Sequence, residues 1–116
     1  MRVLVCGGRY YKNKARVYEE LHHLASQHGW LTIIQGGASG ADWLAAAWAR
    51  EYYHGLISVP AEWNKYGKSA GPIRNKRMLI CTKPNMVLAF PGGHGTADMV
   101  SRARITAVPV VEITDV

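Results

Sequence analysis

The residues of this chain whose types and spacing suggest chemistry are mainly glycines and arginines. One segment, Pro91-Gly-Gly-His-Gly-Thr96, places three glycines within four positions, directly after an apolar run that ends at Phe90. A strand, a glycine loop and a helix in this order form an anion cradle, because glycine lets peptide N–H groups approach a phosphate and the helix N-terminus adds positive potential. The segment Gly36-Gly-Ala-Ser-Gly-Ala-Asp42 repeats this arrangement after the apolar run that begins at Leu31. Two such loops in one chain indicate a nucleotide-like ligand.

Two arginines are placed where they could bind an anion. One follows a pair of glycines, and the other lies at a predicted helix start. Arg9 follows Gly7-Gly8, at the end of the first apolar run, where its guanidinium can hold a phosphate or carboxylate bidentately. Arg74 is predicted in the first turn of a helix, where a cation faces the positive end of the macrodipole unless an anion lies between them. Lys68 precedes it on a loop, and Asn75 offers a donor and an acceptor to a base or sugar. The chain has no GxGxxG fingerprint and no acid placed to bind a ribose as in NAD enzymes, which argues against a dehydrogenase.

These segments give the predicted ligand-binding set. Its members are the loop glycines, the residues that accompany them in the loops, and Asp42, Lys68, Arg74 and Asn75. The full set is Gly7, Gly8, Arg9, Gly36, Gly37, Ala38, Ser39, Gly40, Asp42, Lys68, Arg74, Asn75, Pro91, Gly92, Gly93, Gly95 and Thr96. General acid–base work needs a carboxylate within hydrogen-bond reach of the reacting atoms, and Asp42, Glu62 and Asp98 are the carboxylates to consider. The catalytic candidates are Arg74, Asp42 and Asp98, with no assignment among them. A structural alternative is that Ser39 and Asp42 only cap the following helix as a capping box.

No metal or cofactor is expected. The histidines are scattered along predicted helices without a carboxylate partner pattern, and Cys6 and Cys81 lack metal-type spacing. Both cysteines are predicted to be reduced packing residues.

Alternating strands and helices must position the loops. Apolar runs predict strands at 3–6, 31–35, 56–59, 86–90 and 108–113, the last at a sheet edge because Pro109 stands at its start. Helical periodicity and end signals predict helices at 14–28, 39–53, 72–82 and 96–107, with a polar loop over 61–71. This order predicts an α/β fold: a three-layer Rossmann-like sandwich with a mostly parallel five-stranded sheet and helices on both faces. In such sheets ligands bind beyond the carboxyl ends of the strands, where the glycine loops fall.

Composition limits the classes of protein to consider. The 116 residues suit one domain over 1–116. No apolar run approaches the roughly 20 residues of a membrane span, and the apolar run near the N-terminus is too short for a signal peptide. We therefore expect a cytoplasmic protein without a membrane partner. The net charge of +6 is concentrated in residues 62–83, which suits an anionic small molecule or nucleic acid. Trp43, Trp48 and Tyr52 exceed what a small core requires, which favours a homo-oligomer.

The glycine motifs also carry a family resemblance. Pro-Gly-Gly-x-Gly-Thr after a buried strand, with an upstream Gly-Gly-Ala-x-Gly-Ala-Asp, resembles the SLOG superfamily of Rossmann-like domains. That superfamily includes the LOG phosphoribohydrolases and the DNA-processing protein A family. The segment Tyr66-Gly-Lys-Ser-Ala-Gly-Pro-Ile-Arg-Asn75 looks most similar to the small YspA-type (cpYpsA-related) branch. The resemblance implies a pocket for a nucleotide or ADP-ribose-like ligand.

The resemblance also bears on catalysis. LOG enzymes cleave the N-glycosidic bond of nucleoside monophosphates with an arginine on the third helix and a glutamate three residues after the threonine of the glycine loop. Arg74 matches the first position, but Met99 stands at the second and has no acid–base chemistry. The leading hypothesis is therefore a sensor or sequestering module that binds a nucleotide derivative. The alternatives are a phosphoribohydrolase-like hydrolase and a single-stranded DNA-binding module.

Overall fold

The computed structural model describes residues 1–115 and contains one five-stranded sheet. All strands run parallel in the spatial order β3-β2-β1-β4-β5. Their bounds are β1 Arg2–Cys6, β2 Thr32–Gln35, β3 Gly55–Ser58, β4 Met86–Ala89 and β5 Val110–Glu112. The predicted α/β class is confirmed, and β5 lies at an edge of the sheet as predicted.

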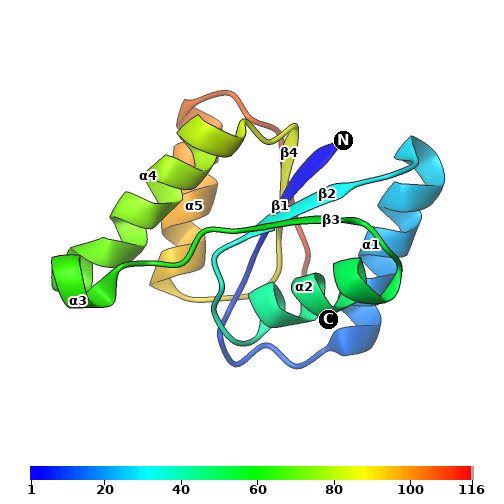
Figure 1. The fold of residues 1–116 in the computed structure, drawn as a ribbon, viewed down its shortest axis with the longest axis horizontal. Helices are drawn as coiled ribbons and strands as arrows, with labels where there is room; N and C mark the ends of the chain where they lie inside the picture. The colour runs from blue at the N-terminus through cyan, green and yellow to red at the C-terminus, as the bar shows by residue number, and fades with distance from the viewer. Residues whose placement is uncertain (116) are drawn as a thin grey trace.

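Helices cover both faces of the sheet (Figure 1). Helices α1 (Lys14–His28) and α2 (Ala41–Glu51) pack together on one face, and α4 (Ala70–Thr82) and α5 (His94–Ile105) pack together on the other. A short helix α3 (Trp63–Tyr66) and a 3₁₀ turn η1 (Gly67–Ser69) lead into α4. None of the helices in residues 1–115 combines the length and apolar character of a membrane span.

The central strand β1 shows why its sequence is apolar throughout. Val3 and Val5 pack in the core beneath α1 and α2, while Leu4 and Cys6 pack in the core beneath α4 and α5. Successive side chains of a strand point to opposite faces, so a strand covered on both faces is apolar at every position. The four side chains are at most 8% exposed.

The chain order creates a switch point between β1 and β4. From β1 the chain moves outward to β2 and β3, and it then crosses back to place β4 on the other side of β1. The loops that leave β1 and β4 therefore diverge to opposite faces of the sheet, which opens a crevice at the carboxyl ends of these strands.

Three helices differ in their bounds from the prediction, and the last of them, α5, spans 94–105 instead of 96–107. The predicted polar loop 61–71 contains α3, η1 and the start of α4, so Arg74 lies beyond the first turn of its helix. Pro72 is tolerated as the third residue of α4, because an N–H group there has no intrahelical partner to lose. The second helix spans 41–51 instead of 39–53, and Gly55, predicted to end it, is the first residue of β3.

Candidate functional site

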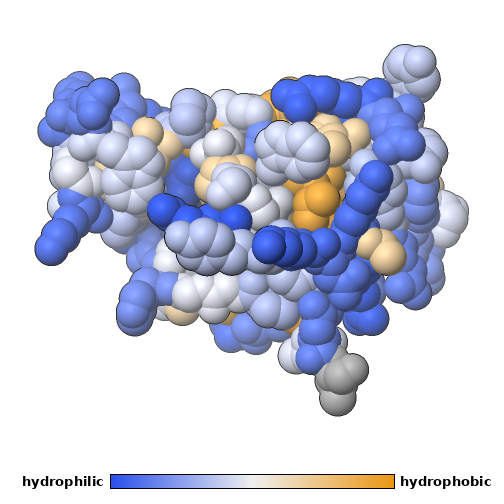
Figure 2. Space-filling view, turned by 90° about the horizontal axis from the view of Figure 1, so that it is seen from below, coloured by the Kyte–Doolittle hydropathy of each residue, from blue (hydrophilic) through white to orange (hydrophobic). Residues whose placement is uncertain are grey.

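A cavity of about 340 Å³ lies at the carboxyl ends of the central strands, at the switch point. This edge of the sheet faces the viewer in Figure 2. The surface there is mostly hydrophilic and surrounds areas of intermediate hydropathy and one small hydrophobic area. The cavity is lined by Val5, Cys6, Gly7, Gly8, Arg9, Tyr10, Gly36, Ala38, Asp42, Arg74, Asn75, Met78, Gly93, His94, Gly95 and Thr96. The loops after β1, β2 and β4 thus meet α4 around one space.

Close backbone packing brings the first two loops together. Gly40 has a φ of +77°, and a Cβ atom there would overlap the carbonyl oxygen of Gly8. The same carbonyl accepts hydrogen bonds from the N–H groups of Ala41 at 3.2 Å and Tyr11 at 3.1 Å. Glycine at position 40 therefore allows the start of α2 to rest on the loop after β1.

Gly36 links the two charged side chains of the cavity. Its carbonyl oxygen accepts a hydrogen bond from Arg74 Nη1 at 2.8 Å, and its N–H donates to Asp42 Oδ2 at 3.1 Å. Ala38 donates a second N–H to the same carboxylate oxygen at 3.3 Å. Arg74 and Asp42 therefore lie on either side of one peptide segment, and each is held by its backbone.

Burial shifts the pKa of both charged groups. Burial raises the pKa of Asp42 to about 6, an effect only partly offset by the hydrogen bond from Ala38, the positive charge of Arg74 and the hydrogen bond from Gly36. Burial likewise lowers the pKa of Arg74, and the negative charge of Asp42 opposes this. Arg74 forms no salt bridge with any residue in the described part of the chain. Its charge is therefore available to an anionic ligand.

Asn75 connects Arg74 to the first turn of α5. Its Oδ1 accepts from Arg74 Nε at 2.9 Å, and its Nδ2 donates to the Gly95 carbonyl at 3.1 Å and to Asp98 Oδ2 at 2.9 Å. Asp98 Oδ2 also accepts from Arg102 Nε at 2.9 Å. With its side-chain amide used in these bonds and only 3% exposure, Asn75 acts here as a structural bridge.

The first turn of α5 presents backbone donors to the cavity. The helix begins after Gly93 without a side-chain cap, and the first helical hydrogen bond runs from Ala97 N to Gly93 O at 3.0 Å. The N–H groups of His94, Gly95 and Thr96 precede it and have no intrahelical partner. Space around the α-carbons of Gly93 and Gly95 is open. Free N–H groups at a helix start can bind an anion. Anion binding by this turn stays a prediction.

The loop 36–40 has fewer free donors than the sequence predicts. Besides the two N–H groups bound to Asp42, Gly37 N donates to Gln35 Oε1 at 2.5 Å. The predicted capping box is wrong, because α2 has no side-chain cap and Ser39 Oγ instead donates to the Arg9 carbonyl at 3.0 Å. Asp42 thus takes up the donors that an anion would use. Ligand contact by this loop stays a prediction.

The structure brings most, but not all, of the predicted site residues together. Those that line the cavity are Gly7, Gly8, Arg9, Gly36, Ala38, Asp42, Arg74, Asn75, Gly93, Gly95 and Thr96. Those that do not line it are Gly37, Ser39, Gly40, Lys68, Pro91, Gly92 and the catalytic candidate Asp98. Lys68 is exposed on η1, and Asp98 is engaged by Asn75 and Arg102.

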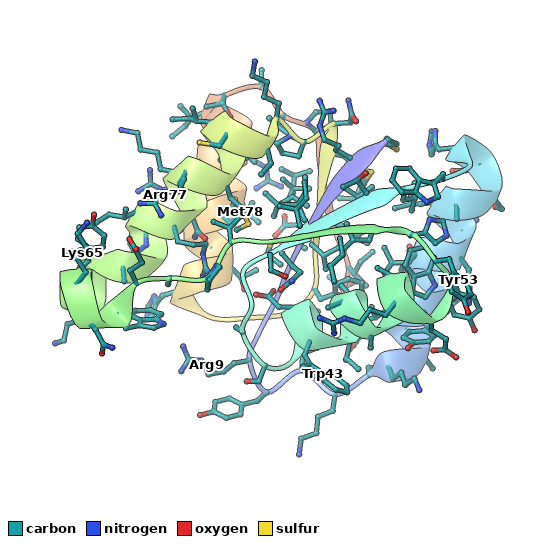
Figure 3. The ribbon with its side chains drawn as sticks, viewed as in Figure 1. Arg9, Trp43, Tyr53, Lys65, Arg77 and Met78 are labelled. Atoms are coloured by element: carbon teal, nitrogen blue, oxygen red, sulfur yellow. The ribbon has the colours of Figure 1, made fainter. Side chains whose placement is uncertain are left out.

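The other basic residues of the segment 62–83 do not line the cavity. Figure 3 shows Arg9 below the sheet on the loop after β1, while Lys65 and Arg77 lie out on α3 and α4. Arg77 pairs with Glu62 at 3.7 Å across an exposed surface. Of the cations in residues 62–83, Arg74 alone lines the cavity.

Five lining residues fall outside the predicted set: Val5, Cys6, Tyr10, His94 and Met78. Cys6, Tyr10 and His94 adjoin predicted residues in the sequence, and Val5 lies two residues before Gly7. Met78 follows Arg74 by about one helical turn, so spacing would have found all five. Cys6 is buried as predicted, and burial raises the pKa of its thiol to about 12. Cys81 is exposed, so its predicted packing role is wrong.

Residues 1–115 contain no group of side chains suited to hold a metal ion. No three histidine, cysteine or acidic side chains among them converge closely enough to hold an ion.

Comparison with known proteins identifies the family. The model of the YAcAr family, described as the YspA, cpYpsA-related SLOG family, matches residues 1–66. This chain belongs to that SLOG family. The match includes the loops after β1 and β2, whereas Arg74 and the glycine loop before α5 lie beyond it. The family and the Rossmann-like fold are those of a nucleotide-related binding module.

Two individual proteins extend the comparison. The gene 61 protein of Mycobacterium phage D29 is 35% identical over 125 residues, which cover 98% of this chain and 97% of that protein. The crystal structure of Acinetobacter baumannii MurG matches with a TM-score of 0.63 and 11% identity. That match covers 96% of this chain but only 34% of MurG, and it supports the fold alone.

Proposed function

We propose that this SLOG protein binds a nucleotide or ADP-ribose-like small molecule and acts as a sensor or sequestering module. The observation that carries the proposal is one cavity that combines the unpaired N–H groups of the α5 first turn with the guanidinium of Arg74. Backbone donors at a helix N-terminus and a nearby arginine both favour a phosphate.

Each charged group has a role in this arrangement. The phosphate rests on His94, Gly95 and Thr96, and Arg74 neutralises its charge from α4. Arg9, exposed at the rim, adds a second positive charge. Asp42 uses Oδ2 for its two backbone hydrogen bonds, which leaves Oδ1 to accept from a ribose hydroxyl.

Among residues 1–115, Asp42 is the one carboxylate that lines the cavity, and this favours binding without turnover. Met99, at the position where LOG enzymes carry a glutamate, is 1% exposed and packs in the core beneath α4 and α5. Asp98, one residue earlier, is held by Asn75 and Arg102.

Isothermal titration calorimetry over a panel of nucleoside mono- and diphosphates and ADP-ribose tests the proposal. Arg74→Gln is expected to weaken binding by roughly 10- to 100-fold, because a charge-assisted hydrogen bond contributes about 1.5–3 kcal/mol. Arg77→Gln is the matched control: it lies on the same helix, three residues on, outside the cavity. No binding by the wild-type protein, or equal losses in the two variants, would contradict the proposal.

A hydrolase is the second candidate, and the pKa of Asp42 favours it. A buried carboxyl with a pKa of about 6 exchanges protons near neutral pH, as a general acid or base must. In this case purified protein would release free base from a nucleoside monophosphate. Asp42→Asn would abolish the release while ligand binding persists. An unchanged rate in that variant would exclude this role for Asp42.

A further inference from the structure

A second groove runs along α5 on the side away from the cavity. It lies between α5, the β4–α5 loop and the end of β5, with a volume of about 630 Å³. It is lined by Ala89, Phe90, Pro91, Gly92, Gly93, Thr96, Ala97, Val100, Ser101, Arg104, Glu112, Ile113 and Thr114. Neither the family match, which ends at residue 66, nor the proposed function assigns this groove a role.

The groove and the cavity meet at the N-terminus of α5. Gly93 and Thr96 line both spaces, so the unpaired N–H groups of the first turn stand between them. A third hollow, at Tyr11 and Trp43, shares no lining residue with the cavity. Of these two hollows, the α5 groove alone shares lining residues with the cavity.

The chemistry of the groove differs from that of the cavity. Its floor consists of the buried side chains Phe90, Val100 and Ile113, all at most 7% exposed. Its one cation, Arg104, already pairs with Glu112 at 2.8 Å. An apolar floor with a neutralised polar rim suits an uncharged unit, such as a sugar, more than it suits another phosphate.

We infer that the α5 groove is a second subsite for the same ligand. The ligand class is a diphosphate that joins a nucleoside to a second uncharged unit, with the diphosphate over the first turn of α5, the nucleoside in the cavity and the second unit in the groove. This inference rests on the proposed function and deepens it: a nucleoside monophosphate would occupy only the cavity.

Affinities for AMP and ADP-ribose, measured by calorimetry, test the subsite. The variants are Ala97→Trp and Ser101→Trp, which change two residues four positions apart that line the groove but not the cavity. Ile105→Trp is the control, because Ile105 is 82% exposed on the same helix and lines neither space. Far-UV circular dichroism checks that each variant folds.

We expect ADP-ribose to bind at least about tenfold more tightly than AMP. Each groove variant should lower the affinity for ADP-ribose about tenfold and leave the affinity for AMP unchanged. Equal wild-type affinities for the two compounds, or folded groove variants that weaken both or neither, would overturn the subsite while the proposed function stands. A wild-type protein that binds neither compound would overturn the proposed function and this inference together.

Discussion

Asp42 is a buried carboxylate whose surroundings favour its neutral form. It is 6% exposed, and burial raises its pKa from an ordinary value of 3.8 to about 6 despite two backbone donors and the positive charge of Arg74. The folded protein therefore binds a proton at Asp42 more tightly than the unfolded chain does. The resulting stabilisation is complete below pH 4 or so and is lost as the pH rises through about 6.

This linkage predicts a pH-dependent difference between wild-type protein and Asp42→Asn. A rise of the pKa from 3.8 to about 6 corresponds to roughly 3 kcal/mol of stability, which the wild-type protein loses between pH 4 and 7 and the neutral variant does not. Urea denaturation at pH 4, 5, 6 and 7 measures the free energy of unfolding of both proteins. The difference in free energy of unfolding between the two proteins should change by roughly 3 kcal/mol from pH 4 to pH 7. A constant difference would show that the pKa of Asp42 is not raised.

At the scale of elements, the loops depend on glycine for different reasons. Gly40 has a positive φ and touches the backbone of the loop after β1, so α2 can begin at this place only if residue 40 has no side chain. Gly95 lies in the first turn of α5 with open space around its α-carbon. The first glycine is required by packing between elements, whereas the second leaves a helix surface uncovered.

These two glycines are expected to respond in opposite directions to alanine. Gly40→Ala should lower the free energy of unfolding by more than 1 kcal/mol or so, because the new Cβ overlaps the Gly8 carbonyl and the φ is unfavourable. Gly95→Ala should raise it by up to about 1 kcal/mol, because alanine loses less entropy in a helix. Thermal and urea unfolding measure both. A Gly40→Ala protein as stable as wild type would contradict the close contact between residue 40 and the Gly8 carbonyl.

Helix α4 is an element whose start the sequence did not reveal. Composition marked residues 61–71 as a polar loop, yet α3 and η1 occupy most of it and continue into α4. No side-chain hydrogen bond caps any of these helical pieces, so the usual N-terminal signal is missing. Pro72 placed Arg74 on a helix, but the prediction of Arg74 in the first turn is wrong, because α4 begins at Ala70.

At the scale of the whole molecule, the tryptophans of α2 show how tertiary packing separates similar residues. Trp48 is fully buried, donates from Nε1 to His22 Nδ1 at 3.3 Å and stacks on His54 with ring centroids 4.3 Å apart. Trp43 is 62% exposed at the other end of the helix. The excess of apolar surface that favours an oligomer therefore involves Trp43 and not Trp48. Oligomerisation itself stays a prediction.

The two tryptophans should differ in their effect on stability. Trp48→Ala is expected to cost about 3–5 kcal/mol, because it leaves a large cavity and removes the partner of His22. Trp43→Ala should change the free energy of unfolding by no more than about 0.5 kcal/mol in the monomer. Urea unfolding at low protein concentration measures both. A large cost for Trp43→Ala under these conditions would place that side chain in the core.

The sequence by itself determined the fold class and the place of the site. Strands that are buried on both faces must be apolar throughout, so the alternation of apolar runs and helical periods identified a parallel sheet. Parallel strands end at one edge, so the glycines after the first, second and fourth strands had to meet there. The family resemblance rested on the same glycines and was confirmed.

Tertiary structure decided which groups at that edge are free to bind. Asp42 and Gln35 occupy the donors of loop 36–40, Asn75 is used as a bridge, and the groove along α5 forms only where that helix meets β5. The contact between Arg74 and Gly36 joins residues 38 positions apart. Such hydrogen bonds depend on the packed positions of whole elements, and a local sequence pattern does not encode them.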